Sequence, residues 1–318
     1  MLTKAGVFPR FDVHAHFAPP ADAGLERLAA DRPGAGGGWT PEVAIDVMDE
    51  RGIDLQLLSL PLEMDADLVR RSNEGAARIV ETHPARFGML ASVPLGTPER
   101  ALDEVRYAGD QLGADGFVLL SNYGGGYLGD PRFDPVFAEL DRRAAAVLVH
   151  PVEPIASDRS GLGRPGPLLE YPVDTARTTV DAMYAGVFLR YPRIKVILAH
   201  AGGALPGLVH RILALGSKTW IPNPNGITRE QMREQLASLY YETAIAGDRS
   251  VLAPVLDLAG AGHLLFGTDF PPAGLDVVDA SADALAASLS AVGRSPADLA
   301  AAFRALFPAA ASRADARR

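Results

Sequence analysis

The sequence predicts an α/β protein, a (β/α)8 TIM barrel that residues 1–318 form as a single domain. Short apolar segments of strand length alternate with helical segments eight times along the chain, as in a parallel barrel. A doubly wound open sheet would have a glycine-rich phosphate turn after its first strand, but this chain has His14-Ala15-His16 there. No short repeat and no change of composition divides the chain into two units.

The first strand, 10–16, is assigned from its alternating pattern. Residues two apart in a strand point to the same face, so Asp12, His14 and His16 are expected on one face and the apolar residues of the segment on the other. Two imidazoles and a carboxylate on the inner face are unusual for a structural strand and indicate a metal there. The other strands are expected at 53–60, 87–93, 116–121, 145–150, 194–200, 239–243 and 263–269.

The first helix is expected to begin at Pro41, with Thr40 as its cap, and to end at Arg51 before Gly52. The other helices are expected at 65–83, 98–112, 131–144, 174–190, 205–215, 249–259, 276–292 and 296–307. The glycine cluster 34–38 and the long segment 151–172 are expected to be mobile βα loops. The last two helices are additions to the barrel, and 309–318 is expected to be a frayed tail.

The composition excludes several classes of protein. The net charge is −9, and nucleic-acid binding needs clustered positive charge. Cysteine is absent, so a disulfide, a thiolate nucleophile and a thiolate zinc site are excluded, and a metal must be held by His, Asp, Glu or water. Residues 1–10 lack an apolar signal core, and no apolar run is long enough to span a bilayer. We therefore expect a soluble cytoplasmic protein that binds neither membranes nor nucleic acid.

Reactive side chains lie at four predicted strand ends. The first strand ends in His14 and His16, the fifth in His150, the sixth in His200 and the eighth in Asp269. Active-site residues of parallel barrels lie at the C-terminal ends of the strands, so we expect these five on one rim. Imidazole and carboxylate groups suit zinc or another divalent transition metal. A single histidine at a strand end is more often a polar core residue, but the five together favour a metal site.

Other polar residues have more than one interpretation. Asp12 is either an acceptor for an imidazole N–H or a structural acceptor at the barrel floor. Glu242, at the end of the seventh strand, either orients His200, contacts substrate or is a solvated rim carboxylate. The remaining histidines are interpreted as structural: His83, His210 and His263.

With these residues the chain resembles the metal-dependent amidohydrolase superfamily. It is most similar to the branch of non-oxidative decarboxylases that act on aminocarboxymuconate semialdehyde, γ-resorcylate and 6-methylsalicylate. The similarity covers residues 12–17, 39–59, 129–151, 172–211 and 266–271, and the run Tyr171-Pro172-Val173-Asp174-Thr175-Ala176-Arg177 is most similar to the 6-methylsalicylate type.

The resemblance implies that His14, His16, His150 and Asp269 bind one divalent metal ion, with zinc expected and manganese compatible. It implies that His200 is an acid/base or water-positioning residue. Two-metal members carry a carboxylated lysine at a central strand end, and the fourth strand has no lysine. The resemblance also implies a homo-oligomer, a dimer or a tetramer.

One departure bears on the substrate. The aminocarboxymuconate semialdehyde enzyme carries a substrate-binding arginine where this chain has Ala44, so a monocarboxylic aromatic acid is expected rather than a dicarboxylate. An arginine that faces the metal could pair with the carboxylate of the substrate, although a helix arginine is by default a surface ion pair. The remaining substrate candidates are four aromatic residues, two arginines and one acid: Phe17, Trp39, Tyr123, Phe270, Arg159, Arg177 and Glu242.

The leading hypothesis is metal-dependent decarboxylation of a hydroxylated aromatic acid similar to 6-methylsalicylate. The metal would bind the phenolic oxygen and the carboxylate, Asp269 would deliver a proton to the ring carbon, and His200 would share the proton load. The alternative is a hydrolase whose metal-bound water attacks a lactone or an amide. A third possibility, a non-catalytic barrel, is disfavoured by the complete ligand set.

Overall fold

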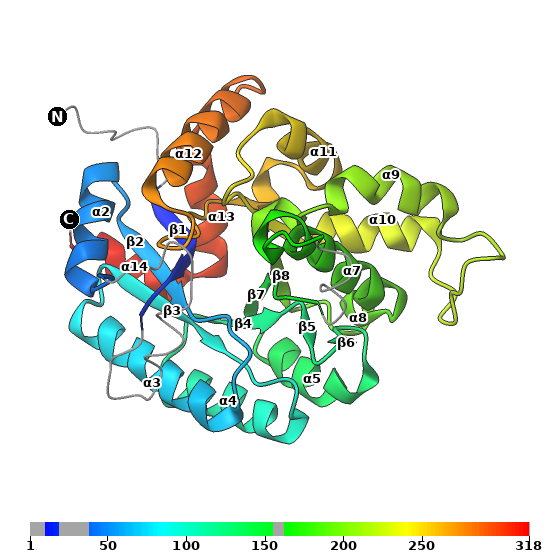
Figure 1. Ribbon diagram of the computed structural model, residues 1–318, viewed down its shortest axis with the longest axis horizontal. Helices are drawn as coiled ribbons and strands as arrows, with labels where there is room; N and C mark the ends of the chain where they lie inside the picture. Colours follow the sequence, from blue (N-terminus) through cyan, green and yellow to red (C-terminus); the bar gives the residue numbers. More distant parts are fainter. Residues whose placement is uncertain (1–9, 19–37, 155–161, 318) are drawn as a thin grey trace.

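Eight parallel strands form one sheet in the computed structural model, which describes residues 10–18, 38–154 and 162–317. Their order around the sheet follows the chain: β1 (Phe11–His16), β2 (Leu55–Ser59), β3 (Phe87–Ser92), β4 (Gly116–Leu120), β7 (Ala146–His150), β8 (Lys195–Leu198), β9 (Tyr240–Glu242) and β10 (Leu264–Leu265). The amide of Val13 donates to the carbonyl of Phe266 at 2.9 Å, and that of His16 to Phe270 at 2.7 Å. These bonds join the first strand to the last, and the predicted barrel is confirmed (Figure 1).

Helices surround the strands on the outside of the barrel (Figure 1). They are α2 (Pro41–Arg51), α3 (Ala66–Thr82), α4 (Pro98–Asp110), α5 (Asp134–Arg142), α7 (Glu170–Tyr184), α8 (Val187–Arg190), α9 (Leu205–Leu215), α10 (Arg229–Ser238), α11 (Arg249–Ala259), α12 (Leu275–Ser290), α13 (Leu299–Leu306) and α14 (Pro308–Asp315). Short 3-10 turns are η2 (Pro131–Phe133), η3 (Gly166–Leu168), η4 (Ala199–Gly202), η5 (Ala261–His263) and η6 (Pro296–Asp298). A small antiparallel hairpin of β5 (Asn122–Tyr123) and β6 (Gly126–Tyr127) follows β4.

The first helix has the predicted bounds. The side chain of Thr40 accepts from the amide of Val43, and Gly52 ends the helix in the left-handed region at φ 71°, where a residue without Cβ is favoured. Helices α9 and α11 also begin and end as predicted.

Several predicted elements were wrong in extent. The helix expected at 174–190 begins earlier and breaks at Gly186, which has φ 72°. The strand expected at 194–200 stops before His200, whose φ is 54°. The strand expected at 263–269 is shortened to β10, and Asp269, beyond its end, has a positive φ of 57°. The β5–β6 hairpin and α10 were not predicted.

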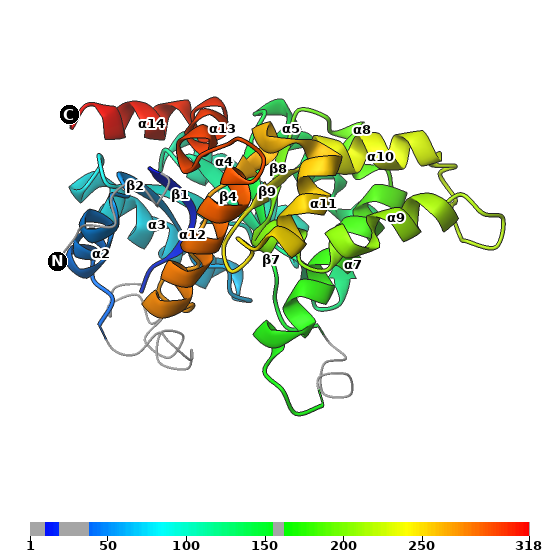
Figure 2. The same ribbon diagram turned by 90° about the horizontal axis from the view of Figure 1, so that it is seen from above.

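Residues 308–315 form α14 instead of the predicted frayed tail, because Ala310, Ala311 and Ala314 are buried. Together α13 and α14 cover the end of the barrel where the strands begin (Figure 2). The ring of Phe303 stacks on Phe11 with centroids 4.3 Å apart. The opposite end, where the strands finish, therefore carries the polar residues.

Most of the predicted mobile loop at 34–38, and the middle of the loop at 151–172, lie outside the described residues. Within the described parts of the chain, every helix is too short or too polar to cross a lipid bilayer.

Candidate metal centre

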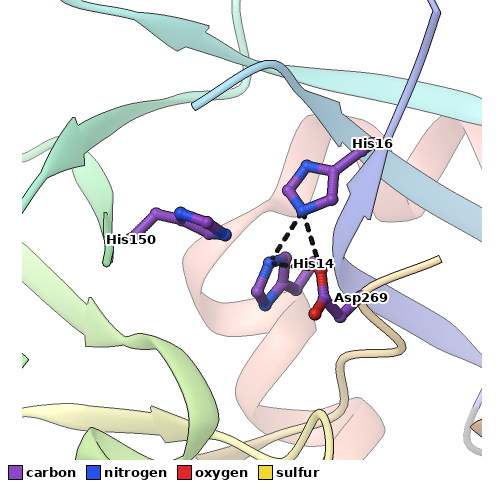
Figure 3. A group of neighbouring side chains, drawn as sticks. All are labelled: His14, His16, His150 and Asp269. Carbon is purple, nitrogen blue, oxygen red and sulfur yellow. Dashed lines mark hydrogen bonds and ion pairs between the residues drawn. The ribbon is translucent and has the colours of Figure 1, made fainter. Parts of the chain in front are cut away.

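Three imidazoles and a carboxylate meet at the C-terminal end of the barrel (Figure 3). His14 and His16 come from β1, His150 ends β7 and Asp269 follows β10, and their possible ligand atoms all lie within 4.8 Å of one another. His16 Nε2 lies 3.2 Å from His14 Nε2 and 2.9 Å from Asp269 Oδ1. The structure thus brings together the four residues predicted as ligands.

A β-bulge in the first strand directs its two histidines toward this centre. The register between β1 and β2 shifts between Asp12 and Ala15. Before the shift, Phe11 and Val13 pack in the core cluster that α13 and α14 complete, and after it Ala15 packs in the main core. The predicted alternation was therefore wrong across this irregularity, whereas His14 and His16 share one face as predicted; bulges commonly re-aim side chains near functional sites.

Asp12 does not support an imidazole. Its carboxylate accepts from Gln56 Nε2 at 2.9 Å, from the Thr268 hydroxyl at 2.7 Å, and from the backbone amides of Thr268 and His14. Burial raises the pKa of Asp12 to about 6, although these hydrogen bonds lower it. Asp12 is thus a structural acceptor that fastens the segment carrying Asp269 to the first two strands.

The Nδ1 atom of every imidazole at the centre faces an acceptor oxygen. His14 Nδ1 lies 2.9 Å from the Glu242 carboxylate, and His16, His150 and His200 point theirs at backbone carbonyls 3.2, 2.8 and 3.0 Å away. Those carbonyls belong to Ser59, Pro151 and Ala244, respectively. A carbonyl or carboxylate partner places the ring proton on Nδ1, so Nε2 keeps its lone pair for a metal. Three nitrogen donors and a carboxylate are a donor set that suits zinc or another divalent transition metal.

Two carboxylates, the buried Glu242 and the partly buried Asp269, favour a positive charge at the centre. Burial lowers the pKa of His14, but the neighbouring Glu242 outweighs it and raises that pKa to about 9. Burial raises the pKa of Asp269, but the hydrogen bond from His16 and the nearby imidazoles hold it below its usual range. A bound cation can supply the positive charge that the proton on His14 supplies in its absence. The electrostatics of the centre therefore fit a metal site.

Glu242 is completely buried and acts behind the ligands. Besides His14, it accepts from the backbone amides of His200 and Ala244. Its prediction as a substrate contact is corrected, because a carboxylate without exposed surface positions His14 and the backbone of His200 instead.

His200 lies beside the four-residue cluster, its ring centroid 5.2 Å from that of His14 and 6.2 Å from that of His150. His200, Ala201 and Asp269 have φ of 54°, 54° and 57°. The left-handed region costs a residue with a side chain about 1–2 kcal/mol, and such strain concentrates at functional sites.

The predicted substrate residues lie in different environments. Phe17 and Phe270 are 4% and 6% exposed and pack in the main core, so their role as pocket walls stays a prediction. Trp39 packs edge-on to Phe17, with its indole N–H buried and without a hydrogen-bond partner in the described residues. Tyr123 lines a cavity, and its hydroxyl donates to the carbonyl of Val93 at 3.0 Å.

Of the two predicted arginines, the structure describes only Arg177. Arg177 lies 3.4 Å from Asp174 on α7 with its side chain half exposed, as its surface interpretation predicts. Arg159 lies outside the described residues. Ala44 is fully buried in the main core, so this packing has no room for an arginine there.

A buried acceptor beside the His150 strand was missed. Asp174 is fully buried and accepts from Ser121 Oγ, Asn122 Nδ2 and the Tyr127 hydroxyl. Ser121 Oγ in turn accepts from the amide of Val152, two residues after His150. The run 171–177 contains Asp174, but its pattern gives no sign of these partners, which come from the unpredicted hairpin and the end of β4.

Comparison with known proteins gives consistent matches. The profile of a family described as amidohydrolase matches residues 11–306. The 6-methylsalicylic acid decarboxylase of Penicillium expansum is 36% identical over 287 residues, which are 85% of this chain and 87% of that protein. The gamma-resorcylate decarboxylase of Rhodococcus jostii (strain RHA1) is 28% identical over 72% of this chain and 77% of its own.

A solved structure supports the fold. The dihydroxybenzoic acid decarboxylase of Polaromonas sp. JS666, with bound manganese and the inhibitor 2-nitroresorcinol, matches with a TM-score of 0.79 and 23% identity. The match covers 95% of this chain and 97% of that one.

Proposed function

Because this chain belongs to the amidohydrolase family, we propose that it is a metal-dependent carboxy-lyase acting on a hydroxylated aromatic acid of the 6-methylsalicylate kind. The observation that carries the proposal is the cluster of His14, His16, His150 and Asp269, with the histidine Nδ1 atoms at acceptor oxygens. The similarity to a 6-methylsalicylic acid decarboxylase supports decarboxylation over the hydrolysis that the same cluster could perform.

The four clustered residues would hold one divalent ion, which we propose to be zinc, with manganese as the ion found in a related fold. When bound, such an ion acts as a Lewis acid toward the phenolic and carboxylate oxygens of the substrate. Glu242, Ser59 and Pro151 contribute by fixing the rings of the three histidine ligands.

Asp269 and His200 are the groups that can move the proton. The reaction adds a proton to the ring carbon that carries the carboxylate. The bond to that carboxylate then breaks, its electron pair restores the aromatic ring, and carbon dioxide leaves. A carboxyl group with a lowered pKa is a strong donor once protonated. His200, held through Nδ1 by the Ala244 carbonyl, is the neighbouring group that resupplies the proton from water.

The test is release of carbon dioxide from a series of 2-hydroxybenzoates by protein loaded with zinc or manganese, with metal content measured in parallel. His200→Ala should lower kcat by about 100-fold or more, as expected for a group that moves a proton, with metal content unchanged. Hydrolysis of lactones or amides without decarboxylation would establish the hydrolase instead. If metal-loaded protein left the whole series intact, the proposal would fail.

A further inference from the structure

A cavity of about 300 Å³ lies at the same end of the barrel as the ligand cluster. It is lined by the segment after β2, the ends of β3 and β4, and the β5–β6 hairpin. This volume is at the lower end of the range of about 300–1,000 Å³ for small-molecule sites, so it suits a ligand with one ring.

Two of the segments that line the cavity adjoin the metal centre. His16 points Nδ1 at the carbonyl of Ser59, and the lining begins two residues later, at Pro61. Leu120, another lining residue, is the register partner of His150 across β4 and β7. An aromatic acid whose polar groups lie at the ligands thus has this cavity next to its ring.

One side of the cavity is apolar. Val118, which belongs to the core cluster inside the barrel, lines it together with Leu120, Val93 and Val69. Val69, Val93, Val118 and Leu120 are all buried. A charged substituent placed among these side chains would lose its hydration without a partner in exchange.

The charged groups at the cavity are acidic. Glu63 and Asp65 line it and are exposed, whereas none of the lining residues in the described part of the chain is a lysine or arginine. Asp65 also caps α3 by accepting from the amides of Asp67 and Leu68. A second carboxylate on the ring would meet these negative charges.

We infer that this cavity takes the uncharged flank of the ring, accepts a small alkyl substituent there and excludes ring substituents with negative charge. The inference rests on the proposed function and adds a substrate preference to it. The part of the lining formed by Val118, Leu120 and Gly96 would select monocarboxylic, alkyl-substituted acids. The expectation of a monocarboxylic substrate was first based on Ala44, which is buried in the core. Here it is based on residues that line a cavity.

Gly96 offers a way to fill the cavity with little disturbance. A Cβ built on it would lie 3.8 and 3.9 Å from the Cβ and Cδ1 of Tyr123, which are ordinary contacts. Gly207 on α9 is the matched control, because a Cβ there meets nothing within 4 Å among the described residues. The comparison is thus between Gly96→Leu and Gly207→Leu, with Gly96→Ala as a smaller variant in case the first does not fold.

The first readout is binding of a pair of unreactive analogues to metal-loaded protein, 2-nitrophenol and 3-methyl-2-nitrophenol, in which a nitro group replaces the carboxylate. We expect Gly96→Leu to weaken the methylated analogue relative to the unsubstituted one by about tenfold or more, the discrimination usual for one methyl group. Gly207→Leu should leave that ratio and the metal content unchanged. Equal weakening of both analogues by Gly96→Leu, or none, overturns the inference.

The second readout is kcat/KM for salicylate and its methyl and carboxyl derivatives at each open ring position. We expect wild-type protein to discriminate against a carboxylate at the position where it favours a methyl group, and Glu63→Lys to reduce that discrimination. Glu63→Lys with an unchanged ratio overturns the charge argument. If wild-type protein decarboxylates none of these acids, the proposed function fails, while the analogue ratio still tests the cavity.

Discussion

Replacing Glu242 by glutamine is expected to change how metal binding depends on pH. The carboxylate is buried and lies 2.9 Å from His14 Nδ1. Against the effect of burial, it raises the pKa of His14 to about 9. At neutral pH the metal-free protein therefore keeps a proton on His14, and an incoming metal must displace it, because a metal ligand has to be deprotonated.

The size of the effect follows from that pKa. Between pH 7 and a pKa of about 9, displacing one proton costs about 2.7 kcal/mol, or about 100-fold in affinity. The apparent affinity of the wild-type protein should thus rise about tenfold per pH unit from 7 to 9. In Glu242→Gln the main group that raises the pKa of His14 is removed, so this slope should become smaller. Loss of the carboxylate behind the ring should also lower the metal affinity by about 10–100-fold. This loss should be fully visible only near pH 9, because at lower pH the proton on His14 weakens metal binding by the wild-type protein as well.

The assay is zinc binding by competition with a chelator between pH 7 and 9, combined with calorimetry in two buffers of different ionisation enthalpy to count released protons. Glu104→Gln is the matched control, because Glu104 is also a buried carboxylate but binds Asn73 and Arg70 away from the metal centre. Equal slopes in the wild type and in Glu242→Gln, or equal affinities at pH 9, would refute this role of Glu242.

Three other outcomes are expected. Asp174→Asn should lower the free energy of unfolding by about 2 kcal/mol in urea titrations, because three donors lose a buried charged acceptor; an unchanged midpoint would contradict this. Ala144→Gly should raise stability by about 1 kcal/mol with kcat unchanged, since Ala144 follows α5 with φ 49°. Chelation should lower the melting temperature, and metal at 100 times its Kd should restore about 2.7 kcal/mol; a melting temperature indifferent to metal would count against the site.

The parts of the fold that could be predicted have local causes. Helix α2 has its cap, its proline and its terminal glycine within the segment itself, and these act wherever the chain is placed. A similar signal was present for α10, whose Thr228 and Gln231 form a capping box. Helix α14 begins at a proline but has no side-chain cap, and it is ordered because its alanines are buried against the barrel end. Tertiary packing of this kind is not visible in a segment of sequence.

The identities of the candidate ligands could be predicted for a topological reason. A parallel barrel brings every strand end to one rim, so His14, His16, His150 and Asp269 converge without any detail of side-chain packing. The bulge in β1 is a different matter. It depends on pairing with β2, so the alternating pattern of the strand could not decide between the two interpretations of Asp12.

The orientation of the rings could not be predicted, because its causes are mostly backbone atoms. Three of the four imidazoles are held by the carbonyls of Ser59, Pro151 and Ala244, and any residue type supplies a carbonyl. Glu242 contributes its side chain at His14, and the Ser59 hydroxyl lies 3.3 Å from His16 Nδ1 beside the Ser59 carbonyl. A substitution at Ala244 that preserves the backbone should thus leave the centre intact, whereas Glu242→Gln should not. The sensitivity of the metal centre to mutation is therefore concentrated in the ligands and in Glu242, even though four acceptors orient the rings.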